Sequence, residues 1–206
     1  VIRQGADIIF EVAPQMMKDS LKVAVDHPDV KILNCSLNTS HKYIRTYYAR
    51  MYEAKFLSGM IGGALAENDR IAYIADYPIY GMIANINAFA LGASFTNPRA
   101  RIYLAWSTSE NYDRERFLKD NNIQVVSDQD MITPRDPGRQ FGLYECSEDG
   151  GKLNLVMPLW NWGVFYEKMI QSILAGSYQS EENSEGRALN YWWGMSAGVI
   201  DLICSK

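Results

Sequence analysis

Carboxylate and aromatic side chains that follow predicted strands are the groups in this sequence best suited to binding a small molecule. Asp128 and Asp130 come directly after the apolar run 123–127. A carboxylate that accepts a hydrogen bond from a sugar hydroxyl contributes roughly 1.5–3 kcal/mol, because hydrogen bonds to charged groups are the stronger kind. An aromatic ring on which a nucleobase stacks adds ~1–3 kcal/mol. Together these groups indicate a neutral ligand that carries hydroxyls and a planar ring.

Further candidate ligand-binding residues follow other predicted strands or begin the helices after them. They are Gln15, Tyr77, Asn111, Tyr112, Trp160 and Asn161. Ligands bind beyond the carboxyl ends of the strands in open parallel sheets, so we expect these side chains to lie there. Other roles remain open, namely Tyr112 as a surface residue and Asn161 as a helix cap. For the two aspartates after residue 127, the alternative role is a turn at the end of a strand.

The sequence contains no arrangement of residues typical of catalysis, cofactor binding or metal binding. His27 and His41 lack partners at a spacing that suits general base catalysis. No Gly-x-Ser-x-Gly motif, phosphate-binding loop or zinc-ligand pair occurs. Asp128 and Asp130 alone are a weak metal signal, because no histidine accompanies them. We therefore expect no catalysis, no cofactor and no metal, with a Rossmann-like enzyme as the weakest alternative.

The composition narrows the class of partner. The 206 residues carry a net charge of −4 and no cluster of Lys or Arg, which argues against nucleic-acid binding. No apolar run approaches the ~18 residues that a membrane-spanning helix needs. Cys35, Cys146 and Cys204 are too few and too scattered for a disulfide framework, so we expect buried free thiols.

Apolar runs and helical periodicities alternate along the chain. Strands are predicted at 7–12, 30–35, 70–75, 100–106, 123–127 and 153–157. Helices are predicted at 14–25, 43–67, 80–95 and 160–175, with 47–66 as one continuous helix. This alternation predicts an α/β fold of parallel sheets flanked by helices on both faces. Gly59, Gly62 and Gly63 predict close packing of their helix against a neighbour, because small residues let another backbone come near. Their spacing differs from that of a dinucleotide-binding loop, which argues against a phosphate-binding role.

Three blocks of sequence carry a family resemblance. Residues 47–98 read YYARMYEAKFLSGMIGGALAENDRIAYIADYPIYGMIANINAFALGASFTNP, an aromatic-rich helix, a strand that ends in YIADYP, and a helix that contains INAFALGA. LWNWGVFYEKMIQSILAG at 159–176 and YWWGMSAGVIDL at 191–202 follow in the family's order. In these blocks the chain resembles the basic membrane lipoprotein family (BMP, purine nucleoside-binding, PnrA-like) of ABC transporter substrate-binding proteins.

The resemblance implies a type I periplasmic-binding-protein-like fold of two lobes. A first lobe from 1–40 plus 192–206 is expected to be incomplete, because in the family an N-terminal section precedes the point at which this chain begins. A second lobe is expected at 43–189.

The resemblance also implies an extracytoplasmic solute-binding protein of an ABC importer. In the full-length protein it would be membrane-anchored through a signal and anchor outside this chain. A purine-nucleoside-like ligand would bind between the lobes and be presented to the ABC permease in the membrane. A non-transporting sensor or regulatory relative with the same fold is the alternative.

Individual residues acquire roles from the same resemblance. Asp128 and Asp130 match the family's acidic segment, and Asn111 and Tyr112 match the position at which an aromatic side chain contacts the ligand. Asp149 matches the segment that helps to hold the sugar, which makes it a further candidate ligand-binding residue, with a place in a solvated loop as the alternative. Around Tyr112 the sequence departs from the family, since it lacks the usual glycine before the aromatic residue and the proline after the next aspartate.

Overall fold

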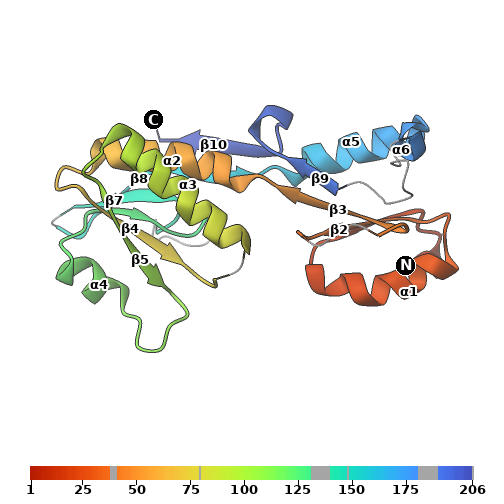
Figure 1. Ribbon diagram of the computed structural model, residues 1–206, viewed down its shortest axis with the longest axis horizontal. Helices are drawn as coiled ribbons and strands as arrows, with labels where there is room; N and C mark the ends of the chain where they lie inside the picture. Colours follow the sequence, from red (N-terminus) through yellow and green to blue (C-terminus); the bar gives the residue numbers. More distant parts are fainter. Residues whose placement is uncertain (38–40, 79, 131–139, 148, 181–189, 206) are drawn as a thin grey trace. The chain divides into compact units, whose positions relative to one another are not determined.

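The computed structural model describes residues 1–37, 41–78, 80–130, 140–147, 149–180 and 190–205. The chain forms two compact units. Unit 1 comprises Val1–Arg50 and Asn161–Val199, and unit 2 comprises Met51–Trp160 and Ile200–Lys206. Each unit is a sheet flanked by helices, so the predicted α/β class is confirmed (Figure 1). None of the described helices is long and apolar enough to cross a membrane.

Unit 1 contains a four-stranded, fully parallel sheet. Its strands are β1 (Ile8–Glu11), β2 (Lys31–Cys35), β3 (Ile44–Ala49) and β9 (Asn190–Trp193), in the order β1-β2-β3-β9. Its helical segments are η1 (Ile2–Gln4), η2 (Pro14–Met16), α1 (Met17–Asp26), α5 (Trp162–Leu174), α6 (Ser177–Ser180) and η3 (Met195–Ala197). Because all four strands run in one direction, their carboxyl ends lie along one edge of the sheet.

Helices α1 and α5 cover opposite faces of the unit 1 sheet. Ala24 of α1 packs against Ile32 and Ile44 in one hydrophobic cluster. Phe165 of α5 stacks on Tyr47, with ring centroids 4.6 Å apart. Ile44 and Tyr47 point to opposite faces, because side chains alternate along a strand. The strands of unit 1 are thus buried on both sides, as their nearly continuous apolar sequences predict.

Unit 2 contains a six-stranded sheet of mixed direction. Its strands are β4 (Arg70–Ala75), β5 (Arg101–Trp106), β6 (Val125–Ser127), β7 (Leu143–Cys146), β8 (Lys152–Trp160) and β10 (Ile200–Cys204), in the order β10-β8-β7-β6-β4-β5. β4 is parallel to β5 and β6, whereas β7 is antiparallel to β6 and β8, and β10 is antiparallel to β8. The prediction of parallel pairing was therefore wrong for β8, and no strand was predicted at the positions of β7 and β10. A connection as short as that between β7 and β8 joins antiparallel strands only.

The helices of unit 2 are α2 (Met51–Leu65), α3 (Tyr80–Thr96) and α4 (Arg114–Asp120). Ile71 and Tyr73 of β4 belong to the cluster that contains Phe89 of α3. Ala72 and Ile74, which point to the other face, belong to the cluster that contains Leu118 of α4. Helices therefore cover both faces of β4, the strand at which the parallel part of the sheet is centred.

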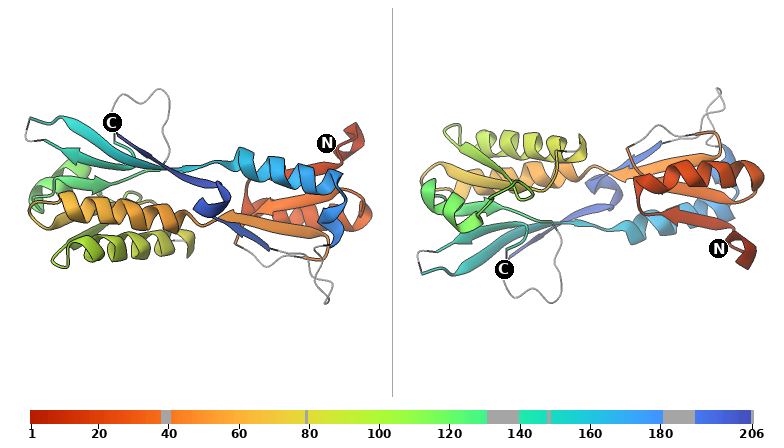
Figure 2. Two further views of the ribbon diagram at one scale, coloured as in Figure 1. Left: turned by 90° about the horizontal axis from the view of Figure 1, so that it is seen from above. Right: turned by 90° about the horizontal axis from the view of Figure 1, so that it is seen from below.

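Helices α2 and α3 lie side by side at unusually close range (Figure 2). A Cβ atom added at Gly59 would overlap the backbone carbonyl of Phe89, and one added at Gly92 would overlap that of Phe56. The Thr96 hydroxyl donates to the carbonyl oxygen of Met60 over 2.8 Å. The small residues of α2 therefore serve helix packing, as their spacing predicts.

The largest secondary-structure error concerns the helix predicted at 43–67 and its continuous stretch 47–66. Residues Ile44–Ala49 instead form β3, and α2 begins at Met51. β-Branched and aromatic residues fill this strand, and it pairs with β2 on one side and β9 on the other, which satisfies its backbone. Trp160, predicted to begin a helix, is the last residue of β8.

The boundaries of the two units also differ from those expected for the lobes. β3 and α5 lie in unit 1, although the expected second lobe ran over 43–189, and β10 lies in unit 2, although 192–206 was expected in the first. Strand pairing explains each difference, because β3 hydrogen-bonds to β2 and β10 hydrogen-bonds to β8. β1 is an edge strand that pairs with β2 alone among the described strands.

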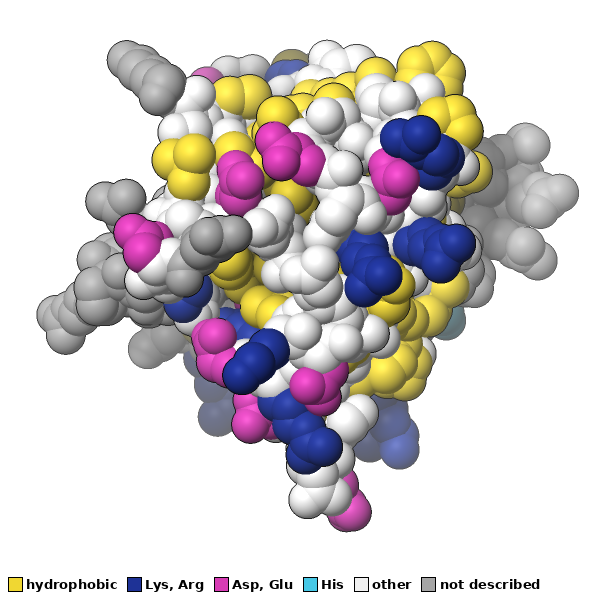
Figure 3. All heavy atoms as spheres, turned by 90° about the vertical axis from the view of Figure 1, so that its left-hand side faces the viewer, with side chains coloured by type: hydrophobic (Ala, Val, Ile, Leu, Met, Phe, Trp, Pro, Cys, Tyr) yellow, Lys and Arg dark blue, Asp and Glu magenta, His cyan; other side chains and the backbone are white. Residues whose placement is uncertain are grey.

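Surface side chains of both charges are interspersed on the face drawn in Figure 3, with apolar groups between them. A continuous basic tract of the kind that follows phosphates is not seen on this face. The three cysteines are free, but they are less buried than expected, since Cys204 is exposed and Cys35 and Cys146 are only partly covered.

Replacing Gly59 by Ala should destabilise unit 2, and replacing Gly62 by Ala should not. The added methyl group at Gly59 meets backbone atoms of α3, and overpacking of this kind costs about 1–3 kcal/mol. At Gly62 the nearest atom is Leu143 Cδ1 at 3.5 Å, an ordinary contact, so the gain in helix propensity of up to about 1 kcal/mol remains. Urea unfolding of both variants measures the difference. Equal stabilities would contradict the close packing of α2 and α3.

Candidate ligand-binding site

The carboxyl ends of β4, β5 and β6 bring polar groups together at one edge of unit 2. Ala75 pairs with Trp106 and Tyr73 with Ser127 in the parallel registers. The residues that follow these strands are therefore neighbours. The Ser107 hydroxyl donates to Asp76 Oδ1, and the Thr108 hydroxyl donates to the carbonyl oxygen of Asp76 over 2.5 Å.

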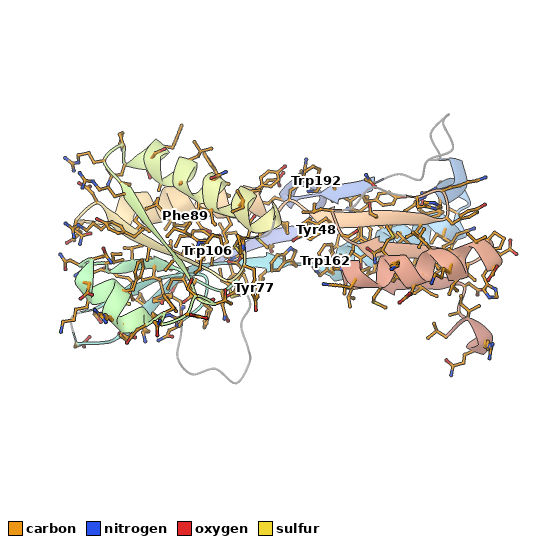
Figure 4. All side chains as sticks on the ribbon, turned by 60° about the horizontal axis from the view of Figure 1, so that its bottom comes forward. Tyr48, Tyr77, Phe89, Trp106, Trp162 and Trp192 are labelled. Carbon is orange, nitrogen blue, oxygen red and sulfur yellow. The ribbon has the colours of Figure 1, made fainter. Side chains whose placement is uncertain are left out.

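Two aromatic side chains belong to the same edge. Trp106 ends β5 and is half-buried, and Tyr77 directly follows Asp76 with 61% of its surface exposed. Both lie toward the end of the unit 2 sheet at which β4 and β5 finish (Figure 4). An exposed ring beside a carboxylate can stack on a planar ligand at no cost to the core.

Asp128 follows β6 and is held by three groups within unit 2. Its Oδ2 lies 2.7 Å from Arg114 Nη2 and 3.4 Å from the Tyr144 hydroxyl, and its Oδ1 accepts from the backbone N–H of Gln129 over 2.9 Å. Burial raises the pKa of Asp128, an effect that the Arg114 guanidinium opposes. Through its ion pair with Arg114, Asp128 fixes α4 to the end of β6.

Asp130 forms an ion pair with a lysine that lies inside the unit. The Lys55 ammonium contacts Asp130 Oδ1, and the two side chains are only 1% and 12% exposed. The ammonium also lies 3.4 Å from Ser127 Oγ and 5.2 Å from the centroid of the Tyr73 ring. Burial alone lowers the pKa of Lys55, but Asp130 and Tyr73 outweigh burial, so its pKa lies above the ordinary value. The pair keeps Asp130 at the edge.

Trp160 lies at the same edge, whereas Asp149 does not. β8 runs parallel to β6, because both are antiparallel to the intervening β7. Val156 of β8 is level with Ser127 at the end of β6, so Trp160 lies four residues beyond it in the same direction. Trp160 ends β8, and its buried Nε1 has no hydrogen-bond partner among the described residues. Asp149 lies in the β7–β8 turn at the opposite edge, where it accepts from Ser147 Oγ over 2.6 Å and from the Gly151 N–H over 3.0 Å.

Asn111 and Tyr112 occupy the connection from β5 to α4. Asn111 is exposed and adopts a φ of 62°, in the left-handed region that asparagine tolerates. Tyr112 is half-buried, and its ring lies 6.4 Å from that of Phe117 in the cluster beneath α4. Part of the Tyr112 ring thus packs against the unit, and the rest remains exposed. This position agrees with neither a fully exposed surface residue nor a ring wholly available to a ligand.

The carboxyl edge of unit 1 is organised by Glu11, the last residue of β1, which is 2% exposed. Asn34 Nδ2 donates to Glu11 Oε2 over 2.6 Å and to the carbonyl oxygen of Ala13 over 3.0 Å. The Ser20 hydroxyl also donates to the Glu11 carboxylate. The Tyr47 hydroxyl donates to the carbonyl oxygen of Glu11 over 3.0 Å. These bonds connect β1, α1, β2 and β3.

An aromatic cluster lies beside this polar network in unit 1. Tyr47 stacks on Phe165 and meets the Trp162 ring edge-on with centroids 5.3 Å apart. Asn161 is exposed at the N-terminal cap position of α5, and its side chain makes no capping hydrogen bond. Gln15 is exposed in η2, directly after β1. The structure thus places Gln15 and Asn161 in unit 1 and the remaining predicted residues in unit 2.

Two cationic residues of the site escaped the sequence analysis, Lys55 and Arg114. A signal for Lys55 was present, because it falls at helical spacing on the face of α2 that also carries Met51 and Ser58, both buried. A lysine on an apolar helix face requires an anionic partner. Arg114 begins α4, and no pattern in the sequence relates it to Asp128, which comes 14 residues later and follows β6.

Parallel strands with polar and aromatic side chains at their carboxyl ends, in two α/β units, define a periplasmic-binding-protein-like fold. The chain belongs to the PnrA-like family of ABC transporter substrate-binding proteins (Bmp), whose sequence profile matches residues 1–134. This family consists of binding proteins rather than enzymes.

Curated relatives differ in the ligands that their names give. A candidate ABC transporter glucose-binding protein from Haloferax volcanii is 27% identical over 205 residues, which cover 94% of this chain and 50% of the relative. A purine-binding protein from Brucella abortus is 25% identical over 214 residues, which cover 98% of this chain and 59% of the relative. The chain thus spans little more than half the length of these relatives.

Solved structures share the fold at low sequence identity. A solute-binding protein from Conexibacter woesei has a TM-score of 0.66 at 16% identity, covering 98% of this chain and 70% of that one. A transcriptional activator of the comK gene from Bacillus halodurans has a TM-score of 0.71 at 13% identity, covering 100% and 74%. A solute-binding protein from Aeropyrum pernix has a TM-score of 0.62 at 14% identity, covering 96% and 60%.

Replacing Lys55 by Met should strongly destabilise the protein at neutral pH. The change leaves the Asp130 carboxylate without its cation, and breaking a buried pair in this way costs about 3–5 kcal/mol. Adding Asp130→Asn to Lys55→Met should restore much of the loss, because the unpaired charge is removed. Arg99→Met is the control, since Arg99 is 82% exposed in its ion pair with Asp69 and such pairs contribute about 0–1 kcal/mol.

The loss in Lys55→Met should also depend on pH. Burial raises the pKa of Asp130, and Lys55 opposes this in the native protein. Without Lys55 the folded state holds the Asp130 proton more tightly than the unfolded state. Stability is therefore highest below the unfolded pKa and falls as pH rises through the folded pKa. Urea unfolding between pH 4 and 8 tests this, and a pH-independent loss equal to that of Arg99→Met would refute the buried pair.

Proposed function

We propose that this chain is the ligand-binding part of an extracytoplasmic solute-binding protein that serves an ABC importer, and that its ligand is a purine nucleoside. The observation that carries the proposal is the unit 2 edge, where Tyr77, Asp130 and Trp160 combine aromatic and carboxylate groups at or just after the carboxyl ends of β4, β6 and β8. Family membership supports binding and delivery to a permease, and the purine-binding relative supports the ligand class.

Each of these side chains suits one part of a nucleoside. Tyr77 offers an exposed face on which the base stacks, and the buried Trp160 Nε1 offers a donor. Asp130 uses Oδ1 for Lys55, which leaves Oδ2 to accept from a ribose hydroxyl. The Lys55 ammonium favours the ionised form of this carboxylate and so opposes the rise in pKa that burial causes, and an ionised acceptor gives the stronger hydrogen bond.

A second candidate function is a non-transporting sensor. It is favoured by the likeness of the fold to the comK transcriptional activator, which covers 100% of this chain. Both candidates bind a small molecule, and binding would shift a conformational equilibrium toward the state with higher affinity. They differ in the partner, which is a permease in the first and an output domain in the second.

Purine nucleosides should stabilise the full chain in thermal unfolding, and D-glucose should not. A ligand at 100 times its Kd adds about 2.7 kcal/mol to folding stability, which gives a shift of several degrees for a protein of this size. Adenosine, guanosine and inosine are compared with D-glucose, and isothermal titration calorimetry confirms each hit. Stabilisation by glucose without any nucleoside response would contradict the proposed ligand class and agree with the glucose-binding relative instead.

Tyr77→Ala should weaken nucleoside binding while leaving folding stability unchanged, because the ring is largely exposed. Loss of one base-stacking contact costs ~1–3 kcal/mol, or about 5- to 150-fold in Kd. Tyr77→Phe is the matched control and should bind as the native chain does, since the ring is kept. Calorimetry gives both Kd values. An unchanged Kd in Tyr77→Ala would show that the base stacks elsewhere.

A further inference from the structure

Asp76 is the carboxylate of the unit 2 edge that is not balanced by a cation among the described residues. Asp130 is paired with Lys55, and Asp128 with Arg114. Asp76 instead accepts a neutral hydrogen bond from Ser107 at Oδ1, and in the part of the chain that the structure describes no ion pair is recorded for it.

Asp76 lies close enough to the other two carboxylates to act on both. Burial has the largest effect on the pKa values of Asp128 and Asp130, and the negative charge of Asp76 adds to the upward shift of both. Among the described residues, Asp128 and Asp130 each have a cationic partner, and Asp76, which is half-buried and adjoins the exposed Tyr77, has none.

We propose that Asp76 sets the charge selectivity of the ligand-binding edge, accepting a hydrogen bond from neutral or positively charged ligands and rejecting anionic ones. This inference rests on the proposed function, because it takes the carboxyl edge of β4, β5 and β6 as the place where the ligand binds. Ser107 and Thr108 orient Asp76 through the hydrogen bonds to its side chain and its backbone carbonyl.

The size of the effect follows from Coulomb's law. Two unit charges ~9 Å apart at an effective dielectric constant of ~25 interact strongly enough to change affinity by roughly tenfold. The charged group of the ligand therefore need not touch Asp76, because a charge at about this distance still changes the affinity. Low ionic strength increases the effect, because salt screens charges beyond about 10 Å at 0.1 M.

Three forms of one nucleoside test the inference on the full chain. Adenosine, its 5′-monophosphate and its 5′-amino-5′-deoxy analogue are titrated by calorimetry into the native chain, Asp76→Asn and Asp149→Asn. Asn keeps an acceptor for Ser107, and Asp149→Asn removes the same charge at the opposite edge of the sheet. The native chain and Asp149→Asn should bind the monophosphate at least tenfold more weakly than adenosine, and Asp76→Asn should reduce that ratio about tenfold. The preference for the amino analogue should fall in the same variant.

The outcomes separate the inference from the proposed function. If adenosine binds the native chain and Asp76→Asn discriminates among the three forms as the native chain does, the inference is overturned and the proposed function stands. If no nucleoside binds, the proposed ligand class is wrong. D-glucose and its 6-phosphate then replace the nucleosides in the same comparison. The inference requires that Asp76→Asn again reduces the ratio of the affinity for the uncharged ligand to that for the phosphorylated ligand. Failure of all these compounds to bind the native chain overturns both. Thermal melting of each variant shows that it is folded.

Discussion

Burial of the Lys55 ammonium against the Asp130 carboxylate is the interaction on which the binding edge of unit 2 depends. Taking both charges out of water is expensive, and the pair is tolerated because each ion has the other within hydrogen-bond reach. The ion pair fixes the N-terminal part of α2 to the segment after β6, across 75 residues of chain. It also holds Asp130 at the edge, 12% exposed, with one oxygen left for another partner.

The two units use different side chains to hydrogen-bond the polar groups at the carboxyl ends of their parallel strands. Parallel strands end at one edge, and the backbone and side-chain polar groups exposed there must be hydrogen-bonded. Unit 2 uses ion pairs, with Arg114 on Asp128 and Lys55 on Asp130. Unit 1 uses uncharged donors, since Asn34 and Ser20 donate to the Glu11 carboxylate beside stacked aromatic rings.

Local patterns predicted most of the regular elements, and contacts between distant segments account for the errors. The apolar run 70–75 forms β4 with the predicted bounds, because a central buried strand leaves a strong sequence signal. β3 was mistaken for helix because its aromatic residues lead into α2, and β9, one of its two partner strands, lies more than 140 residues away. Asp130 could be predicted from its place after a strand, but its pairing with Lys55 could not, since no local pattern reports a contact over 75 residues.

A crystal structure of the full chain with adenosine bound tests the central claim most directly, because it shows where the ligand lies. The account predicts the base on Tyr77 and the ribose within hydrogen-bond distance of Asp130 or Asp76, at the carboxyl ends of β4, β5 and β6, with the Lys55–Asp130 ion pair intact. Adenosine bound elsewhere would contradict it, for example in the hollow of about 290 Å³ at the amino ends of β2 and β3, which Lys31, Lys42 and Arg45 line.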